Sequence, residues 1–356
     1  MIDKTERISI ESLNCPLPLP HQETIVMGHG SGGKMMHDLI AQAFLPAWDN
    51  PILRAGNDAG IVSSREKARL AISTDAHVVS PLFFPGGDIG SLAVCGTVND
   101  IAVMGAQPLY LTASFILEEG LPMETLVQVI ASMRSAAERA AVQIVAGDTK
   151  VVSRGHGDGL YISTAGVGLL DDNVSIHGAN AQPGDAVILS GTLGDHGIAV
   201  LAARGELGIQ ADLQSDIAPL NGLISDMRGA SNNIHVLRDP TRGGLATTLN
   251  EIAGQSKTGI IIEEEKLPIR PAVNAASELL GFDPLYIANE GKLVALVAPD
   301  EAQIVLDVMH QHPLGKEAAI IGHVNTEIQT RVLMKTLIGS HRIIDILMGE
   351  MLPRIC

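Results

Sequence analysis

Aromatic residues and positive charge are both scarce in this sequence of 356 residues. Phe, Trp and Tyr make up 3% of it, and 24 Lys and Arg face 40 Asp and Glu, which gives a formal net charge of −16. Proteins that bind single-stranded nucleic acid use aromatic stacking surfaces, and a negative net charge repels both phosphate backbones and anionic membranes. We therefore expect no nucleic acid and no membrane among its partners.

Long apolar runs and several catalytic motifs are also missing. No window of about 18 uninterrupted apolar residues occurs, and the first residues lead into no apolar signal segment, so we expect a soluble, cytoplasmic protein. The cysteines Cys15, Cys95 and Cys356 are odd in number and far apart, which argues against a disulfide framework and a C-x-x-C metal site. The sequence contains no H-E-x-x-H zinc motif and no G-x-S-x-G nucleophile motif.

Glycine, in contrast, is abundant, with 37 residues. From Ile25 onward short apolar runs alternate with helical patterns, which predicts a mixed α/β (α+β) fold, and the chain length favours two domains. We expect a disordered extension over residues 1–26, an N-terminal domain over 27–172, a C-terminal domain over 173–345 and a mobile tail over 346–356.

Four aspartates of the N-terminal half stand in positions where a carboxylate is costly unless it is paired. Asp75 and Asp148 lie at the predicted ends of strands 69–73 and 142–146, Asp58 follows Asn57 in a short Gly-Asn-Asp-Ala segment, and Asp100 lies with Asn99 on a helix predicted over about 88–104. Any one of them alone is more simply a turn former or a helix N-cap. Together they favour Mg²⁺ sites, through which an acidic protein binds an anionic nucleotide.

Three polar segments offer further candidates, each with a simpler alternative. The glycine-rich run 28–34 has backbone N–H groups for a phosphate, but it fits neither common phosphate-loop spacing, and such a run is more often an ordinary turn. Arg238 and Arg242 precede a predicted helix start, where anions bind, or are solvated surface side chains. Glu290 enters an apolar strand and serves as a general base if burial raises its pKa, or is simply exposed.

The tail places a thiol at the last position, Cys356, three residues after Pro353. Prenylation requires a cysteine four residues from the end, so that modification does not apply. About eight residues of extended chain reach on the order of 25 Å, far enough to carry a group between two sites. A frayed chain end with an incidental cysteine is the alternative.

Read together, these motifs resemble the HypE family, the carbamoyl dehydratases of NiFe-hydrogenase maturation, within the PurM-like superfamily of aminoimidazole ribonucleotide (AIR) synthetase and selenophosphate synthetase. Nine segments carry the resemblance in order: residues 29–33, 73–75, 81–87, 99–100, 147–151, 190–197, 238–244, 289–292 and 353–356. Each is modest alone, but the ordered set, closed by Pro-Arg-Ile-Cys, is specific. Residues 1–26 extend beyond the usual start of the family.

The resemblance implies a PurM-like two-domain fold, with an N-terminal mixed-sheet ATP-binding domain, a C-terminal α+β domain and a flexible tail. It implies that a carbamoyltransferase, HypF, loads the terminal cysteine as a thiocarboxamide, which ATP-dependent dehydration converts to a thiocyanate. Cyanide then passes to iron on a HypC–HypD complex. The cofactors implied are ATP and Mg²⁺, and the implied assembly is a homodimer with ATP near its interface.

The same resemblance assigns roles residue by residue. Cys356 is the modified residue, Glu290 the base, and Lys150 contacts phosphate or the activated oxygen. The metal-binding residues implied are Asp58, Asp75, Asp100 and Asp148. The ATP- and phosphate-binding residues implied are Gly30, Ser31, Gly32, Gly33, Asp75, Asn99, Asp148 and Lys150. The residues that line the path of the tail are Arg238, Arg242 and His196.

Two other functions remain open on the sequence. A selenophosphate synthetase-like enzyme carries a reactive cysteine or selenocysteine in the glycine-rich segment, where this sequence has Ser31 and no cysteine. A non-enzymatic scaffold or metal chaperone for hydrogenase assembly uses the tail thiol and histidines as ligands and hydrolyses no ATP. The aspartates at predicted strand ends disfavour that scaffold.

Overall fold

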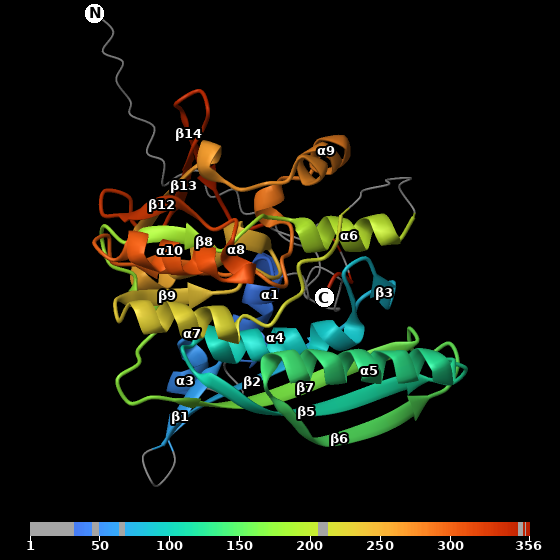
Figure 1. Cartoon of the computed structure of the whole chain (residues 1–356). Coiled ribbons are helices and arrows are strands. Elements are labelled where there is room, and N and C mark those ends of the chain that lie inside the picture. Colours follow the sequence, from blue (N-terminus) through green and yellow to red (C-terminus); the bar gives the residue numbers. More distant parts are fainter. Residues whose placement is uncertain (1–31, 45–49, 64–67, 206–212, 348–351, 353) are drawn as a thin grey trace, which may run out of the picture.

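The computed structural model describes residues 32–44, 50–63, 68–205, 213–347, 352 and 354–356. Two sheets organise these residues, one in each half of the chain (Figure 1). The predicted mixed α/β class is confirmed. The predicted N-terminal extension, with Cys15, lies outside the described residues, as do Gly30 and Ser31.

The first sheet has five strands in the order β1-β2-β7-β5-β6, of which only β5 and β6 run parallel. The strands are β1 (Gly60–Ser63), β2 (Arg69–His77), β5 (Gln107–Glu118), β6 (Gln143–Val152) and β7 (Leu160–Leu170). The helices α4 (Ile89–Val103) and α5 (Met123–Ala140) cover one face of the sheet (Figure 1). The other face carries no helix among the described residues, and apolar side chains are exposed on it.

The helix α4 is buried along almost its whole length, because it lies between the first sheet and the C-terminal half of the chain (Figure 1). A capping box formed by Asp88 and Ser91 fixes its start. Gly96 lets β2 approach closely, since a Cβ atom there would lie 3.0 Å from Oδ2 of Asp75 and from Cε1 of His77. This helix therefore positions the polar side chains of β2.

The second sheet has seven strands in the order β14-β13-β10-β12-β8-β11-β9. They are β8 (Ala186–Leu189), β9 (Ile234–Arg238), β10 (Gly259–Glu263), β11 (Val294–Val297), β12 (Ala319–Asn325), β13 (Val332–Lys335) and β14 (His341–Ile344). The helix α8 (Gly244–Ser256) packs on one face, and α7 (Asn221–Ala230) with α10 (Ala302–Gln311) packs on the other. Each face thus has its own hydrophobic core.

The remaining elements are short or peripheral. They are α1 (Lys34–Leu39), the π-helix Ile40–Phe44, α3 (Pro51–Arg54), β3 (Phe83–Phe84), β4 (Gly87–Asp88), α6 (Asp195–Ala203), α9 (Pro271–Leu280) and four 3₁₀ turns. None of the helices in the described part of the chain is long and apolar enough to cross a membrane.

Two predicted strand ends are wrong. The strands β2 and β6 continue past residues 73 and 146, so Asp75 and Asp148 lie inside strands. Both strands can carry a carboxylate in their interior. The strand β2 alternates buried and accessible positions, and β6 is an edge strand whose residues are mostly exposed. The predicted domain boundaries stay predictions.

Candidate active site

A cavity of about 790 Å³ gathers titratable side chains from both halves of the chain. One wall comes from β2 and α4, and the other comes from the loop after β9, from α8 and from the segment that precedes β11. The titratable residues that line it are His37, Asp58, Asp75, His77, Asp100, Arg238, Asp239, Arg242, Glu251, Glu290 and Cys356. Three of the four predicted metal-binding aspartates, the predicted base and the terminal cysteine therefore share one cavity.

Asp100 and Asp239 show how strongly the carboxylates in this cavity affect one another. The Ser73 hydroxyl donates a hydrogen bond of 2.6 Å to Asp100. Burial, followed by the charges of Asp239, Asp75 and Asp58, raises the pKa of Asp100 well above its usual value. Burial and the charge of Asp58 raise the pKa of Asp239 to about 7. Because these carboxylates repel one another, a divalent cation would stabilise the cluster.

Asp58 is held by a buried arginine. Nη1 of Arg238 donates to Oδ1 of Asp58 over 2.9 Å and to Oε2 of Glu251 over 3.0 Å. Nη2 of the same side chain donates to the Gly56 carbonyl over 2.7 Å. Arg238 thus ties the loop that carries Asp58 to α8, and its predicted place along the path of the tail stays a prediction.

The donor set fits Mg²⁺ in the manner that nucleotide sites use. Within the described residues, no three His, Cys, Asp or Glu side chains converge as a complete metal site. Oδ2 of Asp58 is nevertheless buried with no hydrogen-bond partner in the same residues. Mg²⁺ in nucleotide sites is typically bound by one or two carboxylates, waters and the phosphates themselves, so an incomplete cluster of carboxylates suffices.

Glu290 lies at the edge of the same cavity and is 5% exposed. Its Oε1 has no hydrogen-bond partner among the described residues. Burial raises the pKa of Glu290 well above its usual value, and the charges of Asp75, Asp216 and Asp239 raise it further, while Arg242 acts in the opposite direction. A buried carboxylate with a raised pKa and an available oxygen has the properties of a general base near neutral pH.

Asn99, a predicted phosphate ligand, holds the main chain next to Glu290. Its Nδ2 donates to the carbonyls of Ala218 and Glu290 over 3.1 and 3.2 Å, and its Oδ1 accepts a hydrogen bond of 2.8 Å from the amide of Leu220. The side chain is 1% exposed. These contacts commit the amide group to the protein itself, and contact with phosphate stays a prediction.

The tail enters the cavity between β2 and α6. The amides of Val78 and Ser80 donate to the carbonyls of Cys356 and Arg354 over 3.0 and 3.2 Å, and Val79 bridges Ile355 in antiparallel fashion. Leu352 and Ile355 are buried in the hydrophobic core of the N-terminal half. Arg354 forms an ion pair with Asp158. The described tail residues are therefore docked, with Cys356 inside the cavity.

Arg242 faces the end of the tail. The negative charge at Cys356 is the largest influence that raises the pKa of its guanidinium, and Asp75, 3.9 Å away, also raises it. Gly32 packs on the other side of Arg242 with φ of +73°, and a Cβ atom there would lie 2.9 Å from that of Arg242. Gly33 forms the N-cap of α1. Both glycines therefore lie beside the cavity, although phosphate binding by them stays a prediction.

Asp148 and Lys150 are not in this cavity. They form an ion pair of 2.6 Å with each other on β6 and are exposed. The sheet register sets Asp148 beside Ser114 and Lys150 beside Ile116, on the face opposite to the one that carries Asp75. Within one chain, the structure does not bring these two residues to Asp58, Asp75 and Asp100.

Four titratable residues of the cavity have no predicted role from the sequence: His37, His77, Asp239 and Glu251. His77 is 2% exposed, lies 3.6 Å from Asp75, and has a pKa that burial lowers. It follows Asp75 at i+2 on the same strand, so the alternation of strand faces could have identified it. Asp239 lies between Arg238 and Pro240, in a segment whose sequence predicts a role for the two arginines alone.

Comparison with known proteins identifies the family to which this two-domain architecture belongs. The family profile described as AIR synthase related protein, N-terminal domain, matches residues 56–170, and that of the C-terminal domain matches residues 182–335. The chain is 54% identical over 332 residues to the carbamoyl dehydratase HypE of Cupriavidus necator, which covers 93% of this chain and 95% of that protein. The two halves of the chain therefore match the N- and C-terminal domains of the AIR synthase related family. The predicted PurM-like two-domain fold is confirmed.

Two solved structures are similar over most of their length. The hydrogenase maturation protein HypE in complex with ATP superposes with a TM-score of 0.78 at 47% identity, covering 94% of this chain and 100% of that one. A HypE chain in a HypE–HypF complex superposes with a TM-score of 0.82 at 49% identity, covering 87% and 99%.

Proposed function

Because this chain belongs to the HypE family of carbamoyl dehydratases, we propose that it uses ATP to dehydrate a carbamoyl group on its own Cys356. The product is a thiocyanate, the source of the cyanide ligand for the iron of a NiFe-hydrogenase. The observation that carries the proposal is the position of Cys356, the last residue of the sequence, inside a cavity that also contains Glu290, Arg242 and a group of interacting aspartates. A selenophosphate synthetase has no use for a tail cysteine, and a scaffold that used the tail thiol as a ligand would not need it beside Glu290 and Arg242.

The proposed reaction balances without an oxidant. The carbamoyl oxygen attacks the terminal phosphorus of ATP, and the bond from that phosphorus to ADP breaks so that ADP leaves. The C–O bond then breaks as phosphate leaves, and the nitrogen loses both protons to form the nitrile. Glu290 accepts a proton from the nitrogen, since its free Oε1 is buried beside the tail. Arg242 stabilises negative charge at the end of the tail.

ATP and Mg²⁺ are the proposed cofactors, and the cation would neutralise the phosphate charge. Asp58, Asp75 and Asp100 would hold Mg²⁺, and we add Asp239 to this set because it lines the same cavity and its carboxylate interacts with theirs. The structure of a HypE relative with ATP supports the nucleotide. Gly32 lines the cavity and Gly33 follows it at the start of α1, and we propose that both cover the phosphates.

A homodimer explains why Asp148 and Lys150 face away from the cavity. Apolar side chains are exposed on the helix-free face of the first sheet, at Ile72, Tyr110, Ile116 and Leu169. The register of β2, β7, β5 and β6 aligns these side chains with Asp148 and Lys150. A second copy that covers this face would bury the apolar side chains and bring the two polar residues to a neighbouring molecule.

Two further partners complete the proposed pathway. HypF would load the carbamoyl group, a role that the HypE–HypF complex of a relative supports. A HypC–HypD complex would accept the cyanide. For both exchanges the tail must leave the seat it occupies beside Val79, which is the mobility predicted for residues 346–356.

The test follows the mass of the C-terminal peptide. The full-length protein is incubated with its carbamoyltransferase, carbamoyl phosphate and ATP. We expect a carbamoyl adduct on Cys356 that loses one water only when ATP is present. Cys356→Ala is the control and must remain unmodified. An unmodified Cys356 in the presence of a demonstrably active transferase would contradict the proposal.

A further inference from the structure

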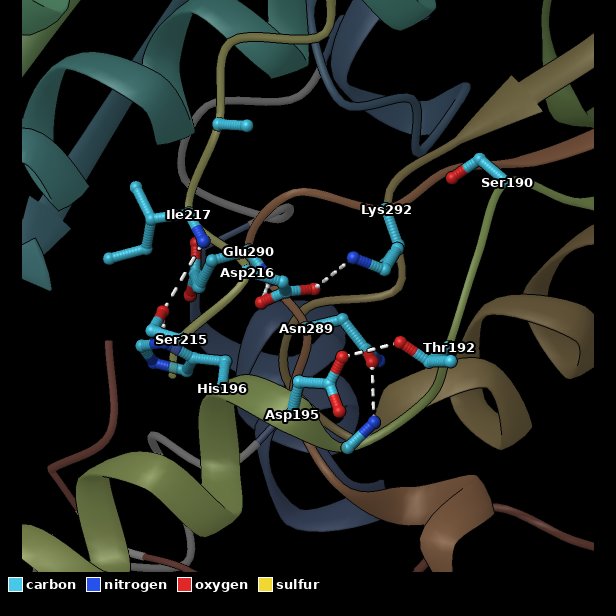
Figure 2. A network of polar contacts seen from close by, with 12 residues as sticks. Ser190, Thr192, Asp195, His196, Ser215, Asp216, Ile217, Asn289, Glu290 and Lys292 are labelled. Atoms are coloured by element: carbon cyan, nitrogen blue, oxygen red, sulfur yellow. Dashed lines mark hydrogen bonds and ion pairs between the residues drawn. The ribbon is translucent and has the colours of Figure 1, made fainter. Parts of the chain in front are cut away.

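The segment that carries Glu290 is held by a second set of polar residues, which include Asp216 and Lys292 and line a second cavity (Figure 2). Oδ1 of Asp216 accepts a hydrogen bond of 3.1 Å from the backbone amide of Glu290. Nζ of Lys292 lies 3.3 Å from Oδ2 of the same carboxylate. The Asp216 and Lys292 side chains are 3% and 12% exposed, so this ion pair is well protected from solvent.

The backbone around Glu290 approaches the Asp216 loop more closely than any side chain would permit. A Cβ atom at Gly291 would lie 1.8 Å from the carbonyl oxygen of Asp216. On the opposite side, Asn99 donates to the carbonyl of Glu290. The backbone of Glu290 is thereby bound at its amide by Asp216 and at its carbonyl by Asn99, and both contacts are buried or nearly so.

The residue before Asp216 connects this loop to the tail. Nδ1 of His196 lies 2.8 Å from the hydroxyl of Ser215, and Nε2 of the same ring lies 2.6 Å from the carbonyl of Ile355. A carbonyl can only accept, so Nε2 carries the proton and Nδ1 accepts from Ser215. Figure 2 shows His196 and Ser215 beside the Asp216–Lys292 pair.

We propose that Asp216, held in place by Lys292, is a positioning residue that fixes Glu290 for proton transfer, and that Ser215 and His196 connect its loop to the docked tail. The inference rests on the proposed role of Glu290 as the base. Within the described residues, Asp216 does not line the cavity that contains Glu290 and Cys356; it lines a separate cavity with Lys292 and Ser190. Its effect on the reaction is therefore exerted through Glu290.

The experiment measures a single turnover of the full-length protein carrying the carbamoyl group on Cys356, started with ATP at varied concentrations. Asp216→Ala removes the acceptor of the Glu290 amide. We expect the rate at saturating ATP to fall between roughly tenfold and 100-fold, while the ATP concentration for half-maximal rate stays unchanged. Asp216→Asn keeps an acceptor oxygen and is expected to restore most of the rate. Glu317→Gln, an exposed carboxylate variant of the same second cavity, is the matched control.

The pH dependence of the rate separates positioning from a purely structural role. The dehydration rate should rise with pH as Glu290 loses its proton. The charge of Asp216 raises the pKa of Glu290, so Asp216→Asn is expected to move this rise to lower pH. The other charged or titratable groups that influence Glu290 or line its cavity are unchanged in this variant: His37, Asp58, Asp75, His77, Asp100, Arg238, Asp239, Arg242, Glu251 and Cys356. A merely structural residue would leave the position of this rise unmoved.

In Asp216→Ala the charge of Lys292 loses its partner, which could prevent folding. A double variant then tests the inference instead. The double variant Asp216→Asn, Lys292→Met removes both charges together and leaves neither unpaired. Because the positive charge of Lys292 opposes that of Asp216, the double variant must show a shift of the rate profile to lower pH that is smaller than the shift in Asp216→Asn alone. A wild-type rate in Asp216→Ala, or an unmoved profile in the Asn variants, would overturn the inference.

Glu290→Gln, measured in parallel, separates this inference from the proposed function. If that variant dehydrates the tail at the normal rate, the role of Glu290 as base fails and the positioning role of Asp216 fails with it. If Glu290→Gln is inactive while Asp216→Ala keeps the wild-type rate, only the positioning role is wrong.

Discussion

The Nε2 atom of His196 donates a hydrogen bond of 2.6 Å to the carbonyl oxygen of Ile355, one residue before the terminal cysteine. The ring is 0% exposed and its pKa is lowered, chiefly by burial, so it is neutral around pH 7. Phe84 meets the imidazole edge to face, with ring centroids 5.6 Å apart. His196 was predicted to line the path of the tail, and the structure brings the two into contact.

Replacing this ring tests whether it holds the tail in its seat. In His196→Leu the carbonyl of Ile355 loses its donor, which costs about 1 kcal/mol and raises the undocked fraction about fivefold. The amides of Val78 and Ser80, which donate to the tail, should then exchange their hydrogens faster by a similar factor. The exposed His156→Ala is the control. Unchanged exchange at residues 78–80 would show that other contacts hold the tail.

Gly32 offers a test of Arg242. Its φ of +73° is costly for any side chain, and a Cβ atom would press on Arg242 at 2.9 Å. We expect Gly32→Ala to lower stability by about 1 kcal/mol and to slow dehydration, because the guanidinium is displaced from the end of the tail. Gly229→Ala in α7, with no atom within 4 Å of its new Cβ, should leave the rate unchanged and raise stability. Normal dehydration by a folded Gly32→Ala would remove Arg242 from the mechanism.

The sequence predicted the class of fold because apolar periodicity depends on local spacing alone. The lengths of the strands were harder to predict from the sequence. The strand β2 runs on to His77, and a strand that continues through polar residues on an accessible face has no apolar run to reveal it. Lengthening the strand by two pairs of residues would have placed Asp75 and His77 on one face and identified the histidine.

Asp148 illustrates a different limit. Its motif suggested the same role as Asp75, yet the register of β5 and β6 directs it to the opposite face of the sheet. Face assignment depends on pairing between strands distant in sequence, and a slip of one residue reverses it. Asp58, Asp75 and Asp100 come together because β2 and α4 pack around Gly96, a contact that no local pattern encodes.

The acidic cavity predicts a pH-dependent effect of Mg²⁺. The pKa of Asp239 is about 7 in the folded protein and near 4 in an unfolded chain, so its contribution to stability is present below about pH 4 and is lost as pH rises through about 7. Asp100 and Glu290 act in the same direction. The free protein is therefore strained by its carboxylates at alkaline pH, where a bound cation relieves the repulsion.

Thermal unfolding with and without Mg²⁺ measures this effect. We expect Mg²⁺ to raise Tm more at about pH 8 than at about pH 6, because protons compete with the cation at the lower pH. Asp239→Asn without Mg²⁺ should melt roughly 2–4 °C higher than the wild type at the alkaline pH, the shift that about 1 kcal/mol produces in a domain of this size. An equal gain from Mg²⁺ at both pH values would indicate that the cation does not bind this cluster.

The exposed face of the first sheet predicts a dimer that mutation can separate. Tyr110 is 47% exposed and lies in the register row of Ile72 and Val167. A charge there cannot be buried without a partner, so Tyr110→Asp should give a monomer in light scattering after size-exclusion chromatography. Met123→Asp on α5, 72% exposed but on the opposite side of the sheet, is the matched control and should remain dimeric. Dimeric Tyr110→Asp would place the interface elsewhere.

Mixing two inactive variants asks whether Lys150 acts on the neighbouring chain. Lys150→Ala lacks the residue on the outer face, and Glu290→Gln lacks the base inside the cavity, so a heterodimer has one complete site if Lys150 works across the interface. Random exchange makes roughly half of the dimers mixed, which restores about a quarter of the sites. Mass spectrometry should find the thiocyanate on the Lys150→Ala chain and not on the Glu290→Gln chain, because the former retains its own base and receives its partner's lysine. Combining both variants with Tyr110→Asp should abolish the recovery. If mixed dimers form and neither chain is dehydrated, Lys150 has no role across the interface, and its ion pair with Asp148 serves only the surface of its own sheet.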